Sequence, residues 1–104
     1  MPLVHVVLCK VKPEVISASS SWSEFESHCQ VLGTTPSLKP LLLECVWAKP
    51  TYEERAKGWN WGLYTKFESK AIYEQYRDHP DHKEFVASKL RPNIDDIMAF
   101  DFEY

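Results

Sequence analysis

The sequence predicts one α+β domain whose strands and helices follow the order βαββαβ. Three observations support this prediction. The chain has 104 residues, which is enough for a single hydrophobic core. Four segments show the apolar runs or the apolar–polar alternation typical of strands. Two other segments carry apolar residues three and four positions apart, as helices do. We therefore expect one domain over residues 1–104.

The first predicted strand covers residues 3–12 and is apolar on both of its faces. One face carries four apolar side chains: Leu3, Val7, Cys9 and Val11. The other carries Val4, Val6 and Leu8. Because alternate residues of a strand point to opposite faces, this pattern predicts a strand that is covered on both sides. Pro13 ends it.

A helix and a second strand are predicted next. The helix has an apolar stripe and then Gly33, a residue type common just after helix ends. The stripe consists of Trp22, Phe25, Cys29 and Leu32. The apolar segment 41–48 predicts the second strand, with Pro40 at its start and Pro50 beyond its end.

The second half of the chain repeats this order. Residues 59–67 predict the third strand because Trp59, Trp61, Leu63 and Phe67 alternate with smaller or polar residues. Ser69 is expected to cap a helix that runs to about Arg77 and turns Ile72, Tyr73 and Tyr76 inward. The pair His79–Pro80 interrupts that helix, and a new one is expected to end at Arg91–Pro92. Residues 97–104 predict the last strand.

This order predicts a ferredoxin-like fold, a four-stranded antiparallel sheet with both helices on one face. The opposite face would then carry a large apolar surface formed by Val4, Val6, Leu8, Leu42 and Val46. We expect a second copy of the chain to cover it. Two sheets packed face to face would give a homodimer of the dimeric α/β barrel type.

Composition and charge exclude several classes of function. The net charge is −3 and the basic residues are scattered among acids, so we expect no nucleic-acid partner. Apolar runs are too short for a membrane span and no secretory signal is recognisable, so we expect no membrane association and a cytoplasmic location. The cysteines Cys9, Cys29 and Cys45 show no CxxC pair and are expected to be small buried side chains.

The residues best suited to chemistry lie in segment 76–85. Tyr76, His79 and His82 are one helical turn apart, and His5 on the first strand is placed to reach the same region. A histidine can accept a proton at neutral pH, and a tyrosine can donate a hydrogen bond to a developing oxyanion. Together they suit removal of a proton next to a carbonyl group and stabilisation of the enolate.

Structural roles are alternatives for each of these residues. Tyr76 also fits a core aromatic, His79 a helix cap or a partner of Asp78 or Asp81, and His5 a satisfied buried histidine. The pattern of histidines and acids does not form a recognisable metal motif, so no metal is predicted. His28 is expected near the surface. Trp47, Trp59 and Trp61 fit core residues of alternating strands, and the alternative is that they stack on a planar ligand.

The same residues resemble the stress-responsive dimeric α/β barrel family over nearly the whole chain. The resemblance rests on segment 4–12, Phe67–Glu68–Ser69, Tyr76 with the HPxH sequence of residues 79–82, and the closing segment 100–102. Within that family the sequence is similar to a plant polyketide cyclase that catalyses an aldol cyclisation. The resemblance implies His82 as general base and Tyr76 as hydrogen-bond donor in catalysis. It also implies a substrate pocket bordered by His5, Val7, Cys9 and Phe85.

We therefore expect a homodimeric, cofactor-independent lyase of the polyketide cyclase type that acts on a carbonyl-rich small molecule. The alternative is a non-catalytic stress-responsive homodimer that binds a hydrophobic small molecule. A haem- or oxygen-dependent monooxygenase is disfavoured because no specific ligand pattern is present in the sequence.

Overall fold

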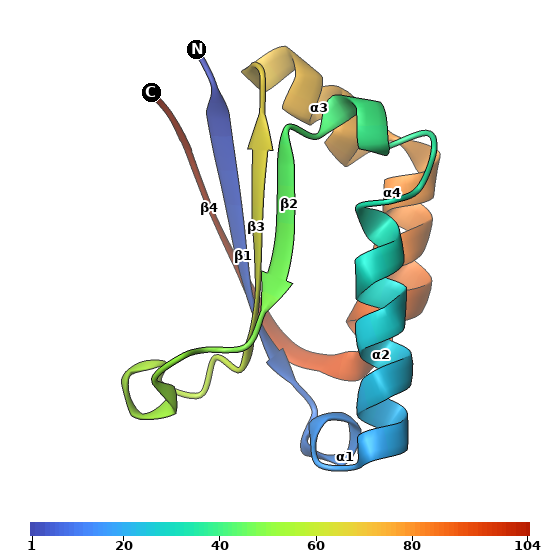
Figure 1. Ribbon diagram of the computed structural model, residues 1–104, viewed down its shortest axis with the longest axis vertical. Coiled ribbons are helices and arrows are strands. Elements are labelled where there is room, and N and C mark those ends of the chain that lie inside the picture. The colour runs from blue at the N-terminus through green and yellow to red at the C-terminus, as the bar shows by residue number, and fades with distance from the viewer.

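The four strands form one antiparallel sheet in the computed structural model, which describes all 104 residues (Figure 1). The order across the sheet is β2-β3-β1-β4, so the first and third strands are central. The strands are β1 (Leu3–Val11), β2 (Glu44–Ala48), β3 (Trp61–Phe67) and β4 (Ile94–Glu103). This is the ferredoxin-like βαββαβ arrangement that the sequence predicts.

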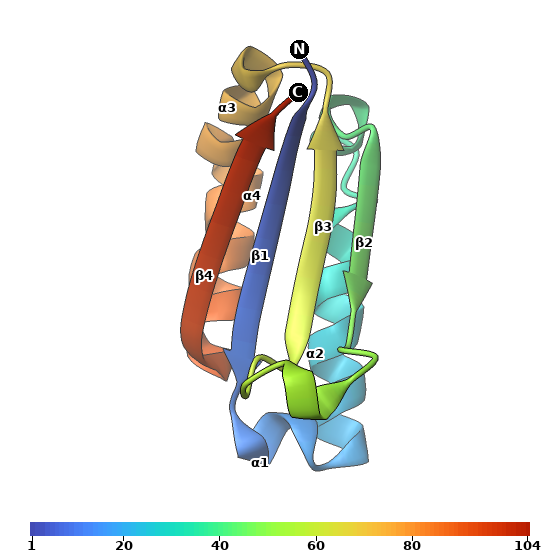
Figure 2. The ribbon, with the colours of Figure 1, turned by 90° about the vertical axis from the view of Figure 1, so that its left-hand side faces the viewer.

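The helices cover one face of the sheet and leave the other open, as the two perpendicular views show (Figures 1 and 2). They are α1 (Pro13–Ile16), α2 (Ser19–Leu32), α3 (Lys70–Asp78) and α4 (Pro80–Phe85). A π-helical turn over Val86–Leu90 extends α4. Short 3₁₀ turns occupy Lys39–Leu41, Glu53–Arg55 and Arg91–Asn93.

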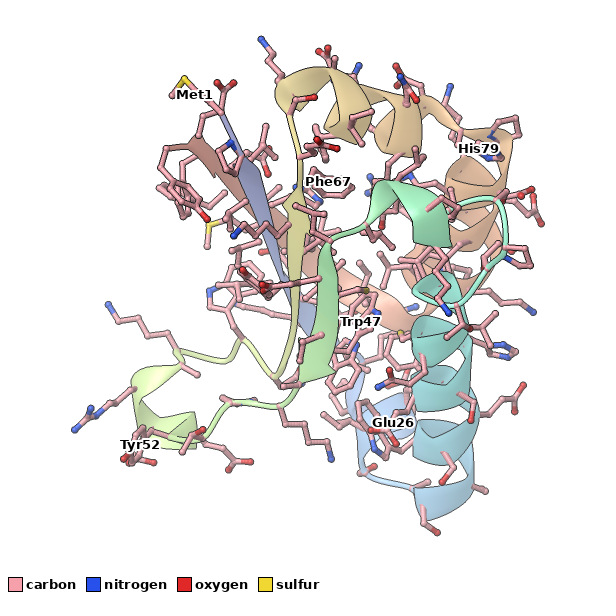
Figure 3. The ribbon with its side chains drawn as sticks, turned by 45° about the horizontal axis from the view of Figure 1, so that its top comes forward. Met1, Glu26, Trp47, Tyr52, Phe67 and His79 are labelled. Carbon is pink, nitrogen blue, oxygen red and sulfur yellow. The ribbon has the colours of Figure 1, made fainter.

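The central strand β1 has the two-sided pattern expected of it. Its odd-numbered residues point toward the helices, where Leu3, Val7, Cys9 and Val11 join the hydrophobic core. Across the core they meet the apolar stripe of α2, of which Phe25, Cys29 and Leu32 are buried and Trp22 packs at the edge. The side chains of Trp47 and Phe67 also lie between sheet and helices (Figure 3). The core therefore occupies the layer between the sheet and the helices.

Local signals fix the ends of the helices near the candidate site. The Ser69 hydroxyl accepts a hydrogen bond from the Ile72 backbone N–H at 3.2 Å, which caps α3 as predicted. His79 ends α3 in an extended conformation, and Pro80 begins α4 at once. The helix interruption predicted from the His79–Pro80 pair is therefore confirmed.

Two predicted strands have different boundaries in the structure. Residues 41–43 do not belong to β2, because Leu41 ends a 3₁₀ turn that Pro40 favours, and pairing with β3 in the sheet begins at Glu44. The last strand begins at Ile94 instead of residue 97, because the polar residues Asp95 and Asp96 lie on an edge strand where their side chains reach water.

Two apolar residues lie elsewhere than expected. Leu42 packs against the core and does not contribute to the open face of the sheet. Trp59 precedes β3 and stacks under the Lys10 ammonium, 4.8 Å from the ring centre. The third strand thus begins at Trp61, two residues later than predicted. Trp59 lies outside it, and Trp61, Leu63 and Phe67 remain in the core.

The open face of the sheet is apolar. Hydrogen-bonded register aligns four side chains in a row across all four strands, in the order Val46, Tyr64, Val6 and Phe100. Met98, Phe102 and Tyr104 add further exposed apolar area on β4. The loop between β2 and β3 projects from the sheet on this side and carries Tyr52 (Figures 2 and 3). We call this surface, formed by Val6, Val46, Tyr64, Met98, Phe100 and Phe102, the open face.

Candidate active site

The sequence places Tyr76 and His82 on either side of the break between α3 and α4. Tyr76 lies in the last turns of α3, and His82 lies in the first turn of α4. Because the chain changes direction at His79–Pro80, the two rings face each other, with their centres 4.4 Å apart and their planes inclined by 44°. The pair predicted from helical spacing is therefore in direct contact.

His82 has one ring nitrogen fixed by the backbone. Its Nδ1 lies 3.0 Å from the carbonyl oxygen of Arg77. Because a carbonyl oxygen can only accept a hydrogen bond, Nδ1 carries the proton and donates it, and Nε2 keeps its lone pair. Burial lowers the pKa of His82 below its ordinary value of 6.5, so the ring is neutral at neutral pH. His82 thus has the protonation state of a general base.

Tyr76 is fully buried and its hydroxyl has no hydrogen-bond partner. Its ring packs against Phe67, with the centres 5.0 Å apart, and against Tyr73. Burial raises the pKa of Tyr76, so the phenol keeps its proton at neutral pH. A buried O–H group without an acceptor is rare in native proteins and marks a site where an acceptor can be accommodated.

His5 is buried on β1 and forms a second histidine site. Its Nδ1 contacts a carboxylate oxygen of Asp101, which lies directly opposite on β4 in the strand register. The ring also lies 4.8 Å from the ring of Tyr73. Sequence reasoning did not predict Asp101 as the partner of His5, because only the pairing of β1 with β4 places the two side chains together.

The other predicted pocket residues are packed in the core. Val7 and Cys9 lie on the helix-facing side of β1, as expected, and burial raises the pKa of the Cys9 thiol to about 12. Phe85 lies at the end of α4 with its ring 6.2 Å from that of Trp47. These residues therefore belong to the same core cluster as Tyr76.

Two surface hollows lie beside the histidines. One, of about 440 Å³, is bordered by His82 together with Arg77, Lys83, Val86, Ala87 and Arg91. The other, of about 400 Å³, lies between α3 and the end of β4 and includes Tyr73, Arg77 and Asp101. Tyr76 borders neither hollow. Of the two rings, only the imidazole of His82 borders a hollow.

The remaining histidines have structural positions. The His79 Nδ1 accepts a hydrogen bond from the backbone N–H of Asp81 at 3.0 Å and so caps α4, which is the structural alternative considered for this residue. His28 is half-buried on α2, 3.7 Å from Glu24. No group of three His, Cys, Asp or Glu side chains converges as metal ligands do.

Three of the four tryptophans pack together in or against the core. Trp47 and Trp61 stack with their ring centres 5.6 Å apart and their planes inclined by 12°. Trp22 meets Trp61 edge to face at 4.8 Å. The indole N–H of Trp47 is buried without an acceptor, whereas that of Trp61 lies beside the Cys29 sulfur, a weak acceptor. Tyr76 and Trp47 therefore provide two unpaired hydrogen-bond donors in the interior.

The fold and these side chains define a class of protein, a ferredoxin-like α+β domain with a histidine–tyrosine pair at the junction of its last helices. A family model described as "Stress responsive A/B Barrel Domain" matches residues 3–104. The chain belongs to this family.

Solved structures show the same fold. A hydroxynitrile lyase from Passiflora edulis is 18% identical with a TM-score of 0.79, and the match covers 97% of this chain and 91% of that one. A Dabb family protein from Mesorhizobium loti is 21% identical with a TM-score of 0.77, over 99% and 96% of the two chains. A protein of unknown function from Thermobifida fusca, described as dimeric and ferredoxin-like, is 18% identical with a TM-score of 0.78, over 100% and 92%.

The comparison with curated proteins gave no match. In the structure itself, none of the helices has the length and apolar composition needed to span a bilayer.

Proposed function

We propose that the protein is a cofactor-independent lyase of the polyketide cyclase type that uses His82 as general base and Tyr76 as oxyanion donor. The observation that carries this proposal is the contact between the two rings, in which Nε2 of His82 is free and Tyr76 keeps an unpaired O–H. A neutral base next to a buried donor is what enolate chemistry requires.

The proposed reaction is an aldol-like ring closure within one substrate molecule. Nε2 of His82 takes a proton from a carbon that lies next to a carbonyl group, and Tyr76 donates a hydrogen bond to the resulting enolate oxygen. The enolate carbon then forms a bond to a second carbonyl carbon of the same chain. The new alkoxide receives the proton back from His82, so neither a cofactor nor an oxidant is consumed.

The unpaired donors of the interior support a substrate rich in carbonyl groups. Tyr76 and Trp47 each bury a donor that has no acceptor in the protein. Each unpaired buried donor destabilises the folded protein by about 1–3 kcal/mol. Carbonyl oxygens of a bound substrate would satisfy these donors. His5, Val7, Cys9 and Phe85 are then the proposed neighbours of the bound chain, because they lie in the same layer.

A relative's chemistry is compatible with this proposal. The Passiflora edulis protein of the same fold is a hydroxynitrile lyase. Cleavage of a hydroxynitrile also begins with removal of a proton by a base. Cyanohydrins therefore belong in the set of substrates to be tested beside poly-β-keto compounds.

We propose that the working form is a homodimer joined through the open face. Exposed apolar side chains continue across all four strands of this face, and water would otherwise contact them. Fold neighbours from Thermobifida fusca and Bacteroides fragilis are described as dimeric. The three free thiols support a reducing, cytoplasmic location.

One observation favours the alternative of a non-catalytic binding protein. A mainly apolar hollow of about 490 Å³ lies on the open face beneath the loop between β2 and β3, bordered by Val6, Val46 and Trp59 among others. A hollow of this size accommodates a small hydrophobic molecule. Neither His82 nor Tyr76 borders it.

The decisive experiment replaces His82 by Gln and Tyr76 by Phe and measures turnover of poly-β-keto thioesters and cyanohydrins. Either substitution is expected to lower kcat by about a hundredfold or more, because each removes one proton-transfer or oxyanion group. His28→Gln is the matched control, because His28 is a half-exposed histidine on the other long helix. Unchanged turnover in the His82 and Tyr76 variants would overturn the catalytic proposal. Binding of a hydrophobic molecule at the open face without turnover would support the alternative.

A further inference from the structure

The hollow beside His82 is bordered by positively charged side chains. The whole chain has a net charge of −3, yet the hollow is bordered by Arg77, Lys83 and Arg91 in addition to His82. The remaining two residues, Val86 and Ala87, are apolar, and no acidic residue borders the hollow. Positive charge beside a small apolar surface is suited to an organic anion.

The three cations of this hollow are not equivalent. Arg77 donates to both carboxylate oxygens of Asp78, at 2.8 and 3.0 Å, and also lies 3.9 Å from Glu74. Its charge is therefore compensated within the protein. Neither Lys83 nor Arg91 has a carboxylate within 4.0 Å. These two side chains remain available to an external anion.

Val86, Ala87 and Arg91 all border the hollow. The Arg91 N–H bonds to the carbonyl oxygen of Val86, five residues earlier, and closes a π-helical turn beside the hollow. Such turns occur frequently at functional sites.

We propose that Lys83 and Arg91 bind an anionic group of the substrate, a carboxylate or a phosphate, and so hold the substrate beside His82. This inference rests on the proposed function of His82 and adds a substrate class to it. The charged group would lie between the two cations, and the apolar part next to it would contact Val86 and Ala87. His82, on the same wall of the hollow, would then face the neighbouring part of the substrate.

The test is a titration of the protein with three probes of similar shape: benzoate, phenyl phosphate and the neutral benzamide. Binding is followed through the NMR signals of the His82 ring in protein with isotope-labelled histidine. Benzoate or phenyl phosphate is expected to bind and to raise the pKa of His82, because an anion nearby favours the imidazolium form. Benzamide is expected to leave the signals unchanged. A response to only one of the two anions identifies the group that the site takes.

Variants locate the binding site. The double variant Lys83→Gln, Arg91→Gln is expected to raise the Kd of the bound anion by at least about tenfold, because charge-assisted hydrogen bonds are lost. Lys89→Gln is the control, because Lys89 is exposed in the same π turn but borders a different hollow. Equal anion binding in the double variant, or equal binding of benzamide, would overturn the inference.

The outcome is separable from that of the proposed function. His82→Gln is expected to abolish turnover while anion binding, followed in this variant by isothermal titration calorimetry, persists, because Lys83 and Arg91 remain. Anion binding that depends on the two cations, in a protein that turns over no carbonyl substrate, would support the anion site and contradict the lyase proposal. Turnover that depends on His82, with anion binding that does not depend on the cations, would contradict the anion site alone.

Discussion

The imidazole of His82 is defined by what its two nitrogens contact. One nitrogen donates to the Arg77 carbonyl, which leaves the other nitrogen as the basic atom. The same ring is half-buried against Tyr76, and this burial opposes its protonation. A histidine in this state acts as a base at neutral pH without help from a second residue. The surroundings of this side chain therefore predict that the stability of the protein depends on pH.

We expect acid to destabilise the protein partly through His82. Its pKa in the folded protein lies below the ordinary value of 6.5, so just below pH 6.5 the unfolded chain binds more protons. The free energy of unfolding should therefore fall as the pH drops through this window. Urea unfolding at about pH 7.5 and about pH 5.5 measures the change. This decrease in the free energy of unfolding should be smaller in the His82→Gln variant than in the wild type. In the His28→Gln variant it should equal the wild-type decrease. An equal decrease in all three proteins would contradict this assignment.

At the residue scale, the sequence predicted the histidine–tyrosine pair but not its surroundings. Tyr76 and His82 could be paired because helical spacing relates residues that are close in the chain. The contact of His5 with Asp101 could not, because it depends on the register of two strands far apart in sequence. The π turn that precedes Arg91 has no recognisable signal in the sequence.

At the scale of elements, the end of α2 depends on close packing with β2. Gly33 was expected to close this helix, and it occupies the C-cap position. Its φ is −73°, however, so the left-handed conformation that commonly selects glycine is not used. A Cβ atom added at this position would lie 3.0 Å from the Sγ of Cys45. Glycine therefore allows the helix end to approach the strand.

The substitution Gly33→Ala tests this packing. We expect it to lower the free energy of unfolding by about 1 kcal/mol, because the added methyl group overpacks the contact with Cys45. In a Cys45→Ala background, where the sulfur is absent, the same change should be neutral or stabilising, since alanine favours the helical conformation. Chemical denaturation of the four proteins gives both values. The same loss in both backgrounds would show that the sulfur is not responsible.

The order of elements was more predictable than their boundaries. Ser69 and the His79–Pro80 pair act within a few residues, so their effects on α3 and α4 could be predicted from local sequence. The apolar residues 41–43 fit a strand equally well by composition, yet they precede β2. Only pairing with β3 decides where that strand begins.

At the scale of the whole molecule, the sheet is covered by helices on one face only (Figure 2). On the other face, Phe100 is 65% exposed and lies opposite Val6 in the strand register. The prediction of an apolar open face came from alternation within single strands. Its continuity across four strands follows from the register, which brings Val46, Tyr64, Val6 and Phe100 into one row.

Phe100→Asp is expected to separate the proposed homodimer. A charge at the β4 end of this row should raise the dimer dissociation constant by about thirtyfold or more, as for an interface hot spot. Val31→Asp is a matched control, because Val31 is 58% exposed but lies on α2, away from the sheet. Sedimentation equilibrium measures both variants. Equal dissociation of the two, or a wild-type protein that stays monomeric, would contradict the dimer.

The buried thiols also have a consequence for the molecule as a whole. Cys9 on β1 and Cys29 on α2 are both buried in the core between the sheet and the helices. Burial raises the pKa of each thiol to about 12. The folded protein therefore presents almost no thiolate to oxidants or alkylating reagents, whose reaction requires that form. Both cysteines become reactive only when the helices separate from the sheet. The rate at which a thiol reagent labels them therefore reports how often the domain opens or unfolds.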